Sequence, residues 1–420
     1  MTSAATVTRR IASGIMTEGL ARTGRRALRR AARLLVDRWS LVDQEFPLLP
    51  EDVVYQPTVA RDHQKPPVTG TLRIGWVCTP PGPGSGGHTT FFRMVQAMES
   101  RGHQCTLYLY DPGTDSVGHH RQTIARHWPG LRAEVRSVSE GLDSVDAVVA
   151  SSWPTAHVIV QRAPERAHRF YFIQDYEPYF YPRGVLYSLA EHTYGFGLTN
   201  IALGGMIANV MKAELGFPPE AIVPFGCDTT VYRLLDGPPA RPRTGVVHYA
   251  KRGVDRRGYI LAKLALERFH ELAPDQEIHI YGDQVNGWSV PVTNHGSLPP
   301  QELNELYNRT IAGLAISFTN VSLVPGELLA AGNIPILNKE PFAYGLLTDQ
   351  DAVWAPPSPE GLAQALADAV HAGNINERAA RIAGRSRVGW SATQDAFAAV
   401  LESTCSGSDQ TASGQTGGRS

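Results

Sequence analysis

Short apolar runs recur along the chain, and each is followed by a loop and then by a stretch with helical spacing. A short run that is apolar on both faces is typical of a strand buried in a parallel sheet. Such runs predict strands over 72–78, 105–110, 145–151, 169–173, 246–250, 277–281, 311–316 and 334–337, with a shorter apolar stretch at 201–203. Between them, apolar positions three or four residues apart predict helices over 91–101, 186–194, 206–215, 260–272, 300–309, 361–371, 377–382 and 390–403.

The alternation of strands and helices predicts two successive series of βαβ units. We therefore expect an α/β protein with two Rossmann-like doubly wound domains that face a cleft. The segment 225–245 contains Gly237, Pro238, Pro239 and Pro242 and is the best candidate for the connection between them. The expected boundaries are a basic helical extension and linker over 1–70, two domains over 71–235 and 236–385, a helix crossing back to the first domain over 386–402, and a disordered tail over 403–420.

Composition narrows the class of protein. The chain has 420 residues, 42% of them hydrophobic, and a formal net charge of −1, which is typical of a soluble protein and argues against nucleic acid as a partner. The four cysteines lack the spacing of metal ligands. With no apolar run of membrane-span length and no secretory signal, we expect reduced thiols and a cytoplasmic location.

Residues 1–45 differ from the rest, because arginines interleave with leucine and alanine at helical spacing between Arg22 and Leu35. A basic amphipathic helix of this kind can lie on an anionic membrane surface, which here would be the inner face of the plasma membrane. The alternative is a solvated helix that docks its alanine-rich stripe on its own domain. The sequence favours neither interpretation.

The segment 311–337 is the most informative stretch. A predicted strand is followed by a polar loop and by a helix with Pro325 in its first turn and Gly332 at its C-terminal cap. A helix N-terminus past the carboxyl end of a strand is where open α/β sheets bind phosphate. Glu327 would also lie in the first turn, where a carboxylate turned aside can accept hydrogen bonds from sugar hydroxyls. The alternative is that Glu327 only complements the helix dipole.

A glycine-rich loop follows the first predicted strand. Gly82, Gly84 and Gly87 satisfy G-x-G-x-x-G, and Asp111 ends the next strand, so the loop resembles a dinucleotide fingerprint. Three prolines make it stiffer and longer than a Rossmann turn, and His88 occupies the helix start. The same glycines would let the loop lie close to a substrate with free N–H groups. An ordinary βα loop remains the alternative.

Basic residues gather after the strand 246–250, at Lys251, Arg252, Arg256 and Arg257. Cationic side chains there can neutralise a diphosphate without a metal ion. A solvated charged loop is the alternative. The D-x-D match at 349–351 does not directly follow a predicted strand and reads as a polar turn, so we expect no metal.

The run QDYEPY over 174–179 combines carboxylates and aromatic rings at a strand end. Carboxylates bind sugar hydroxyls and aromatic rings stack on sugar faces, so the run suits an acceptor or hexose subsite. Asp175 or Glu177 could act as a general base, and His88 competes for that role. A surface turn with ordinary tyrosine packing is the alternative.

With these segments in order, the chain resembles GT-B glycosyltransferases, and within them the bacterial rhamnosyltransferase family typified by WsaF. The matching runs are GGH (86–88) with FFR (91–93), RGH (101–103), ASSWPTA (150–156), FIQDYEP (172–178), AEHTY (190–194), PFGCD (224–228), YAK (249–251), RRG (256–258) and TNVSLVPGE (319–327). They extend over roughly residues 70–400, and the runs at 174–178 and 320–327 are the most specific.

The resemblance implies that the first domain takes mainly the acceptor and the second the nucleotide. It implies that Glu327 holds the deoxyribose hydroxyl and that the Ser322–Leu323 backbone meets the pyrophosphate, helped by Lys251, Arg256 or Arg257. It also places Asp283 near the base and Asn320 among the donor-binding residues, with Gly86, Gly87, His88 and Tyr176 on the acceptor side. Two departures stand out. Thr319 occupies the position of the first of two glutamates found in related retaining enzymes, and Lys251 replaces a usual arginine.

We therefore expect a retaining glycosyltransferase that transfers a deoxyhexose, L-rhamnose from dTDP-rhamnose, to a cell-envelope or exopolysaccharide glycan or lipid-linked glycan, with no metal and no cofactor beyond the donor. The alternatives are a UDP- or GDP-sugar donor, an NAD-dependent oxidoreductase built on loop 82–87, and a nucleotide- or glycan-binding protein without turnover, for which Thr319 is the reason.

Overall fold

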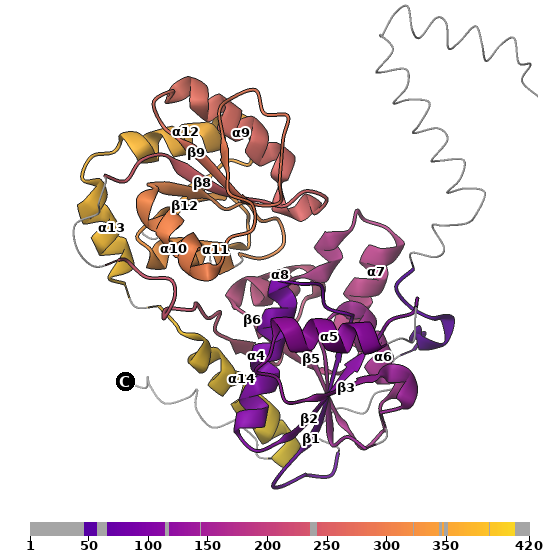
Figure 1. Cartoon of the computed structure of the whole chain (residues 1–420). Coiled ribbons are helices and arrows are strands. Elements are labelled where there is room, and N and C mark those ends of the chain that lie inside the picture. The colour runs from indigo at the N-terminus through magenta and orange to yellow at the C-terminus, as the bar shows by residue number, and fades with distance from the viewer. Residues whose placement is uncertain are drawn as a thin grey trace, which may run out of the picture. The chain divides into compact units, whose positions relative to one another are not determined.

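The computed structural model describes residues 46–56, 65–113, 117–142, 144–235, 242–321, 323–343, 347, 352–385 and 387–407 (Figure 1). The chain divides into two units after Val53, and the described segment of the first unit contains a 3-10 turn, η1 (Pro50–Asp52). Val54–Ser420 forms the second unit, which carries both sheets. The basic helix expected within residues 1–45 lies outside the described residues.

The first sheet is entirely parallel, with the order β3-β2-β1-β4-β5-β6-β7 among the described strands. Its strands are β1 (Arg73–Cys78), β2 (Gln104–Leu109), β3 (Glu134–Ser137), β4 (Ala147–Ala150), β5 (His168–Ile173), β6 (Thr199–Leu203) and β7 (Ala221–Val223). Every residue of β4 and β5 is buried, which explains why these strands read as continuous apolar runs.

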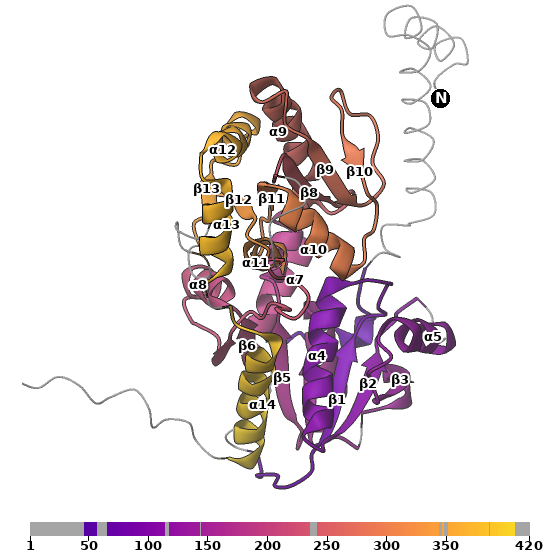
Figure 2. The ribbon, with the colours of Figure 1, turned by 60° about the vertical axis from the view of Figure 1, so that its left-hand side comes forward.

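Helices pack around the first sheet (Figures 1 and 2). They are α4 (Gly86–Ser100), α5 (Val117–His127), α6 (Trp153–Arg162), α7 (Val185–His192) and α8 (Gly205–Leu215), with 3-10 turns η3 (Val138–Glu140), η4 (Glu177–Phe180) and η5 (Thr193–Gly195). Ser85 caps α4, because its hydroxyl accepts from the His88 N–H at 3.5 Å.

The second sheet repeats this plan with the order β10-β9-β8-β11-β12-β13, again parallel throughout the described strands. Its elements are β8 (Val246–Ala250), η6 (Asp255–Arg257), α9 (Tyr259–Leu272), β9 (Ile278–Gly282), β10 (Thr293–Asn294), α10 (Pro300–Arg309), β11 (Ala312–Leu314), α11 (Leu323–Ala330), β12 (Ile334–Asn338), β13 (Val353–Ala355), α12 (Pro359–His371) and α13 (Ile375–Ala383).

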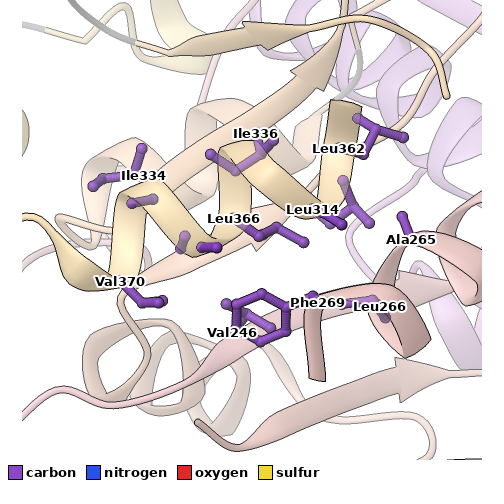
Figure 3. Close-up of a cluster of buried hydrophobic side chains, with 14 of the residues drawn as sticks. Val246, Ala265, Leu266, Phe269, Leu314, Ile334, Ile336, Leu362, Leu366 and Val370 are labelled. Carbon is purple, nitrogen blue, oxygen red and sulfur yellow. The ribbon is translucent and has the colours of Figure 1, made fainter. Parts of the chain in front are cut away.

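Neighbouring residues of β8 serve opposite faces of this sheet. Val246 packs with Phe269 of α9 and Leu366 of α12, in the cluster that Figure 3 shows. Val247 packs on the other side, with Leu306 of α10 and residues of α11. Burying one such side chain stabilises the fold by about 1.5–3 kcal/mol, so each face holds its pair of helices in place.

Both sheets have a point at which the strand order reverses. It lies between β1 and β4 in the first sheet and between β8 and β11 in the second. Ligands of open α/β sheets bind at the carboxyl ends of the strands beside this point. A ligand site is therefore expected at the loops after β1 and β8.

The last helix, α14 (Trp390–Ser406), returns from the second sheet to the first and lies against α4 (Figures 1 and 2). Cys227 N–H donates to Val388 O at 2.9 Å, which pairs the two chain segments that pass between the sheets. The helix extends to Ser406, past the predicted start of a disordered tail at residue 403. That boundary was wrong because Leu401 and Cys405 continue the buried face, while residues 408–420 lie outside the described residues.

Candidate active site

A cavity of about 680 Å³ opens where the loops after β1, β5, β8 and β11 meet. A volume in this range is typical of small-molecule sites. One wall comes from the first sheet and the other from the second. Most of the residues singled out in the sequence line it, namely Gly86, Gly87, Asp175, Lys251, Arg256, Arg257, Asn320, Leu323 and Glu327.

The glycine loop after β1 forms the edge of the first wall. Residues 82–87 all line the cavity, and Gly84 has φ +69°, a left-handed conformation that glycine adopts without strain. A side chain on Gly86 would meet no atom within 4 Å, so the backbone there is open. Gly86 and Gly87 are the first residues of α4, whose N–H groups have no acceptor within the helix.

The structure places His88 behind this loop and outside the cavity lining. Its Nε2 donates to Thr79 O at 2.9 Å, which leaves Nδ1 to accept from the Ser85 hydroxyl at 2.8 Å. Burial lowers the pKa of this imidazole, so the neutral ring is favoured. With both nitrogens engaged, His88 fixes the loop and does not reach the cavity.

The loop after β5 divides its predicted site residues between two places. Gln174 and Asp175 line the cavity, whereas Tyr176 and Glu177 do not. Tyr176 is fully buried, stacks on Tyr194 with ring centroids 5.4 Å apart, and donates its hydroxyl to Glu191 Oε1 at 3.1 Å. It is a packing residue in the structure.

Glu177 is also buried, with 5% of its surface exposed, and its Oε2 accepts from the Trp153 N–H at 2.6 Å. That N–H belongs to the first residue of α6, so the carboxyl group caps this helix. Burial raises the pKa of Glu177 to about 8. A group that lies outside the lining and is engaged with a helix end is poorly placed as a general base, which leaves Asp175 as the candidate.

The second wall carries the positive charge. Lys251, Arg256 and Arg257 line the cavity from the loop after β8. Lys251 Nζ lies 3.1 Å from Asp283 Oδ1, and Asp283 also accepts from the Arg252 N–H at 2.8 Å. Asp283 is outside the lining, so the structure shows it orienting the basic loop, and its predicted contact with a base stays a prediction.

Gly258 holds the two arginines against the loop after β11. Its φ is +61°, and a Cβ added to it would lie 2.6 Å from Ile316 Cγ2. Arg257 Nη1 donates to Ser317 Oγ at 3.3 Å, and the Phe318 N–H donates to Arg256 O at 3.1 Å. The glycine is needed here both for its backbone conformation and for the close packing.

Glu327 lies among tyrosines on the second wall. Tyr307 donates its hydroxyl to Glu327 Oε2 at 3.4 Å, and the hydroxyls of Tyr281 and Tyr307 are 2.6 Å apart. Tyr232, Tyr249 and Tyr281 also line the cavity. Burial raises the pKa of Glu327 to about 7, and the nearby charge of Asp228 acts in the same direction.

The expectation that Glu327 lies in the first turn of its helix was wrong. The helix starts at Leu323, earlier than Pro325 suggested, so Glu327 is one turn further along. Since the effect of the helix dipole falls off within the first turn, dipole complementation becomes a weaker explanation of this carboxylate. Leu323, at the helix start, lines the cavity. Ser322 and the D-x-D run lie outside the described residues.

The structure also bears on the dinucleotide interpretation of loop 82–87. Asp111 accepts from the Gly113 N–H at 3.1 Å and lies 3.3 Å from His120 Nε2, outside the cavity lining. It therefore does not face a ligand bound at the glycine loop.

The sequence analysis assigned no site role to several lining residues, among them Leu203, Phe225, Tyr232, Tyr249 and Leu303. Tyr249 could have been found, because it precedes the end of β8 beside the basic loop. Tyr232 and Leu303 gave no signal, because they reach the cavity only through the packing of distant segments.

Solved structures with this arrangement decide the fold. HepE from Anabaena, in complex with UDP and glucose, matches with a TM-score of 0.59 over 79% of this chain and 100% of its own, at 14% identity. The pneumococcal O-GlcNAc transferase GtfA, with UDP and GlcNAc, matches with a TM-score of 0.56 over 80% of this chain and 99% of its own, at 10% identity. The chain has the GT-B fold.

Another GT-B structure, WaaG, a glycosyltransferase involved in lipopolysaccharide biosynthesis, matches with a TM-score of 0.51 at 14% identity over 78% of this chain and 99% of its own. By sequence, the chain is 30% identical over 322 residues to the O-antigen biosynthesis protein RfbC of Myxococcus xanthus. This match covers 73% of the chain and spans about 25% of the relative's length. No protein-family model matches.

Two further properties of the described part of the chain concern the requirements of a membrane-spanning helix and of a metal site. None of its helices is long and apolar enough to cross a membrane. Nowhere within it do three His, Cys, Asp or Glu side chains gather as a metal site would require.

Proposed function

We propose that the chain is a glycosyltransferase that takes a nucleotide-sugar as donor and a glycan as acceptor. The observation that carries the proposal is the composition of the second wall. Three cationic side chains line it, and so does the carboxylate of Glu327 together with Tyr249 and Tyr281. A diphosphate and a sugar hydroxyl are the ligand groups that suit such a pair.

Lys251, Arg256 and Arg257 would hold the diphosphate and stabilise the charge that develops as the glycosyl bond breaks. The start of α11 at Leu323 adds N–H groups without intrahelical acceptors. Lys251 is already paired with Asp283, but Arg256 and Arg257 still supply two positive charges to a bound diphosphate, so we propose that transfer needs no divalent metal. Added EDTA should then leave the rate unchanged.

Glu327 would accept a hydrogen bond from a hydroxyl of the donor. The resemblance to rhamnosyltransferases favours dTDP-rhamnose, with the deoxyribose hydroxyl on Glu327. A UDP-sugar is the second candidate, because structures of HepE, to which this chain is similar, hold UDP, UDP-glucose or UDP with glucose. The site residues themselves fit the shared chemistry of both donors.

The first wall suits a neutral acceptor. Among its described residues, the charged side chain that lines the cavity is the carboxylate of Asp175, beside glycines, Ser85, Thr90 and Gln174. A phosphate or carboxylate acceptor group would be repelled there, whereas a sugar hydroxyl could donate to Asp175. The reacting end of the acceptor is therefore proposed to be an uncharged sugar of an envelope glycan, including one carried on a lipid.

We propose a retaining reaction. The bond from the anomeric carbon to the diphosphate oxygen breaks, the acceptor oxygen bonds to that carbon on the same face, and the acceptor proton passes to the departing diphosphate. In this scheme Asp175 orients the acceptor hydroxyl. Inversion of the anomeric centre, seen by NMR of the product, would contradict it.

Residues 1–45 are proposed to contact the inner face of the plasma membrane, on the basis of their basic amphipathic pattern. Deleting them should abolish co-sedimentation with anionic liposomes and leave nucleotide binding unchanged. Equal sedimentation of the full and shortened chains would remove this proposal.

A thermal-shift panel tests the donor assignment. The protein is heated with dTDP, dTDP-rhamnose, UDP-glucose, GDP-mannose or NAD, each with EDTA. A ligand at a hundred times its dissociation constant adds about 2.7 kcal/mol of stability. We expect stabilisation by dTDP-rhamnose, lost in Arg257→Ala and kept in Arg252→Ala, whose side chain is exposed outside the lining of the same loop. Stabilisation by NAD alone would contradict the proposal.

A further inference from the structure

The loops after β5 and β11 are hydrogen-bonded to each other beside the cavity, although they follow strands of different sheets. Thr319 donates its hydroxyl to Asp175 Oδ1 at 2.8 Å. Asn320 donates its side-chain amide to Gln174 O at 2.7 Å. These two bonds join consecutive residues of one loop to consecutive residues of the other.

Thr319 and Asp175 stand in different places relative to the cavity. Asp175 is half-buried and lines it, whereas Thr319 is fully buried, at 0% exposure, and does not. Thr319 therefore cannot touch a ligand in the cavity. The second oxygen of Asp175 receives no hydrogen bond from the described residues and remains available.

We propose that Thr319 is a positioning residue that fixes the Asp175 carboxylate with one oxygen while the other receives the acceptor hydroxyl. This inference rests on the proposed function, in which Asp175 orients that hydroxyl. The first sheet contributes the carboxylate and the second sheet sets its direction, so the acceptor site is complete only while the two loops are joined.

The Thr319 hydroxyl is needed to hold the Asp175 carboxylate in place because a second group, Arg256, also attracts it. Its charge interacts with that of Arg256, whose guanidinium lies 4.1 Å over the Phe180 ring. Without the bond to Thr319, the carboxylate is free to turn toward this cation. Such a turn would move Asp175 from the acceptor and place it beside a group assigned to the diphosphate.

The test measures dTDP release from dTDP-rhamnose with water as the acceptor, together with the dissociation constant of dTDP. Thr319→Val removes the hydroxyl at nearly constant shape and should lower the release rate at least tenfold, with dTDP affinity within twofold. Thr319→Ser keeps a hydroxyl that can donate to Asp175, so this variant should retain most of the rate. Thr123→Val is the control, because it removes a threonine hydroxyl that donates to His119 O at 3.2 Å on α5, outside the cavity lining, and its rate should not change.

A double-mutant cycle makes the assignment specific. If the two side chains act as a unit, Asp175→Asn combined with Thr319→Val should be no slower than the slower single variant. Multiplied losses, or a full rate in Thr319→Val, would overturn the proposal. The same cycle run on melting temperature tests the bond without turnover, and additive shifts there would also overturn it. Coupled melting shifts with no donor turned over by the wild type would instead locate the failure in the proposed function.

Discussion

Replacing Glu327 gives the sharpest prediction about donor binding. In Glu327→Ala the donor loses a hydrogen bond to a charged group, which is worth about 1.5–3 kcal/mol. At about 1.4 kcal/mol per tenfold, the dissociation constant of dTDP-rhamnose should rise about 10- to 150-fold. Folding should change less, because the Tyr307 hydroxyl keeps its partner at Tyr281, 2.6 Å away.

The protonation state of Glu327 adds a pH dependence with a definite sign. Burial raises the pKa of Glu327 to about 7 in the free protein, and a bound hydroxyl favours the carboxylate. If only the carboxylate binds, affinity is lost as the pH falls through 7 and should be up to about tenfold weaker at pH 6 than at pH 8. Glu327→Gln should remove this difference.

Isothermal titration calorimetry at pH 6, 7 and 8 measures both effects. The ligand should be dTDP-rhamnose, because its diphosphate lacks the terminal phosphate proton that titrates near pH 6 in free nucleotides. Glu302→Ala, an exposed carboxylate in the first turn of α10, is the control. Unchanged affinity in Glu327→Ala, or an equal pH dependence in Glu327→Gln, would refute the role of this carboxylate.

Two further predictions concern stability. Gly258→Ala should lower the free energy of unfolding by about 1–3 kcal/mol more than Gly253→Ala does. Both glycines have positive φ, but of the two only Gly258 lacks room for a Cβ. Equal losses of stability in denaturant unfolding would contradict this packing argument. Burial raises the pKa of Glu177 from 4.5 to about 8, so its contribution is fully present below pH 4.5 and is lost as the pH rises toward 8. The melting temperature should therefore fall less steeply between pH 4.5 and 8 in Glu177→Gln than in the wild type. Glu305→Gln, which changes an exposed carboxylate, should leave the slope unchanged. An unchanged slope in Glu177→Gln would show that Glu177 is not the group responsible.

Much of the fold could be predicted from apolar runs. The strands β8 and β12 lie where the runs over 246–250 and 334–337 predicted strands, because both strands are buried on both faces. The elements that were missed have another character. The strand β3 reads Glu-Val-Arg-Ser and α5 is rich in histidine and arginine, so neither shows an apolar pattern, and both are held by contacts with their neighbours.

Local pattern also located much of the candidate site, because loops at strand ends could be identified. It could not separate Asp175 from Tyr176 and Glu177, which share one short run but face different surroundings. That difference arises from the 3-10 turn η4, which turns Glu177 toward the start of α6. In the sequence, Thr319 in place of a glutamate was the reason to consider a protein without turnover. Only the structure shows that the Thr319 hydroxyl reaches Asp175.

The direct test of glycosyl transfer is an NMR time course with dTDP-rhamnose, EDTA and a panel of neutral methyl glycosides and oligosaccharides. We expect the anomeric signal of the donor to disappear while free dTDP and a new glycoside signal appear together. Charged acceptors, such as sugar phosphates, should react at least tenfold more slowly. A donor that stays intact with every acceptor and in water, while it still binds, would contradict transfer and leave a binding protein with the GT-B fold.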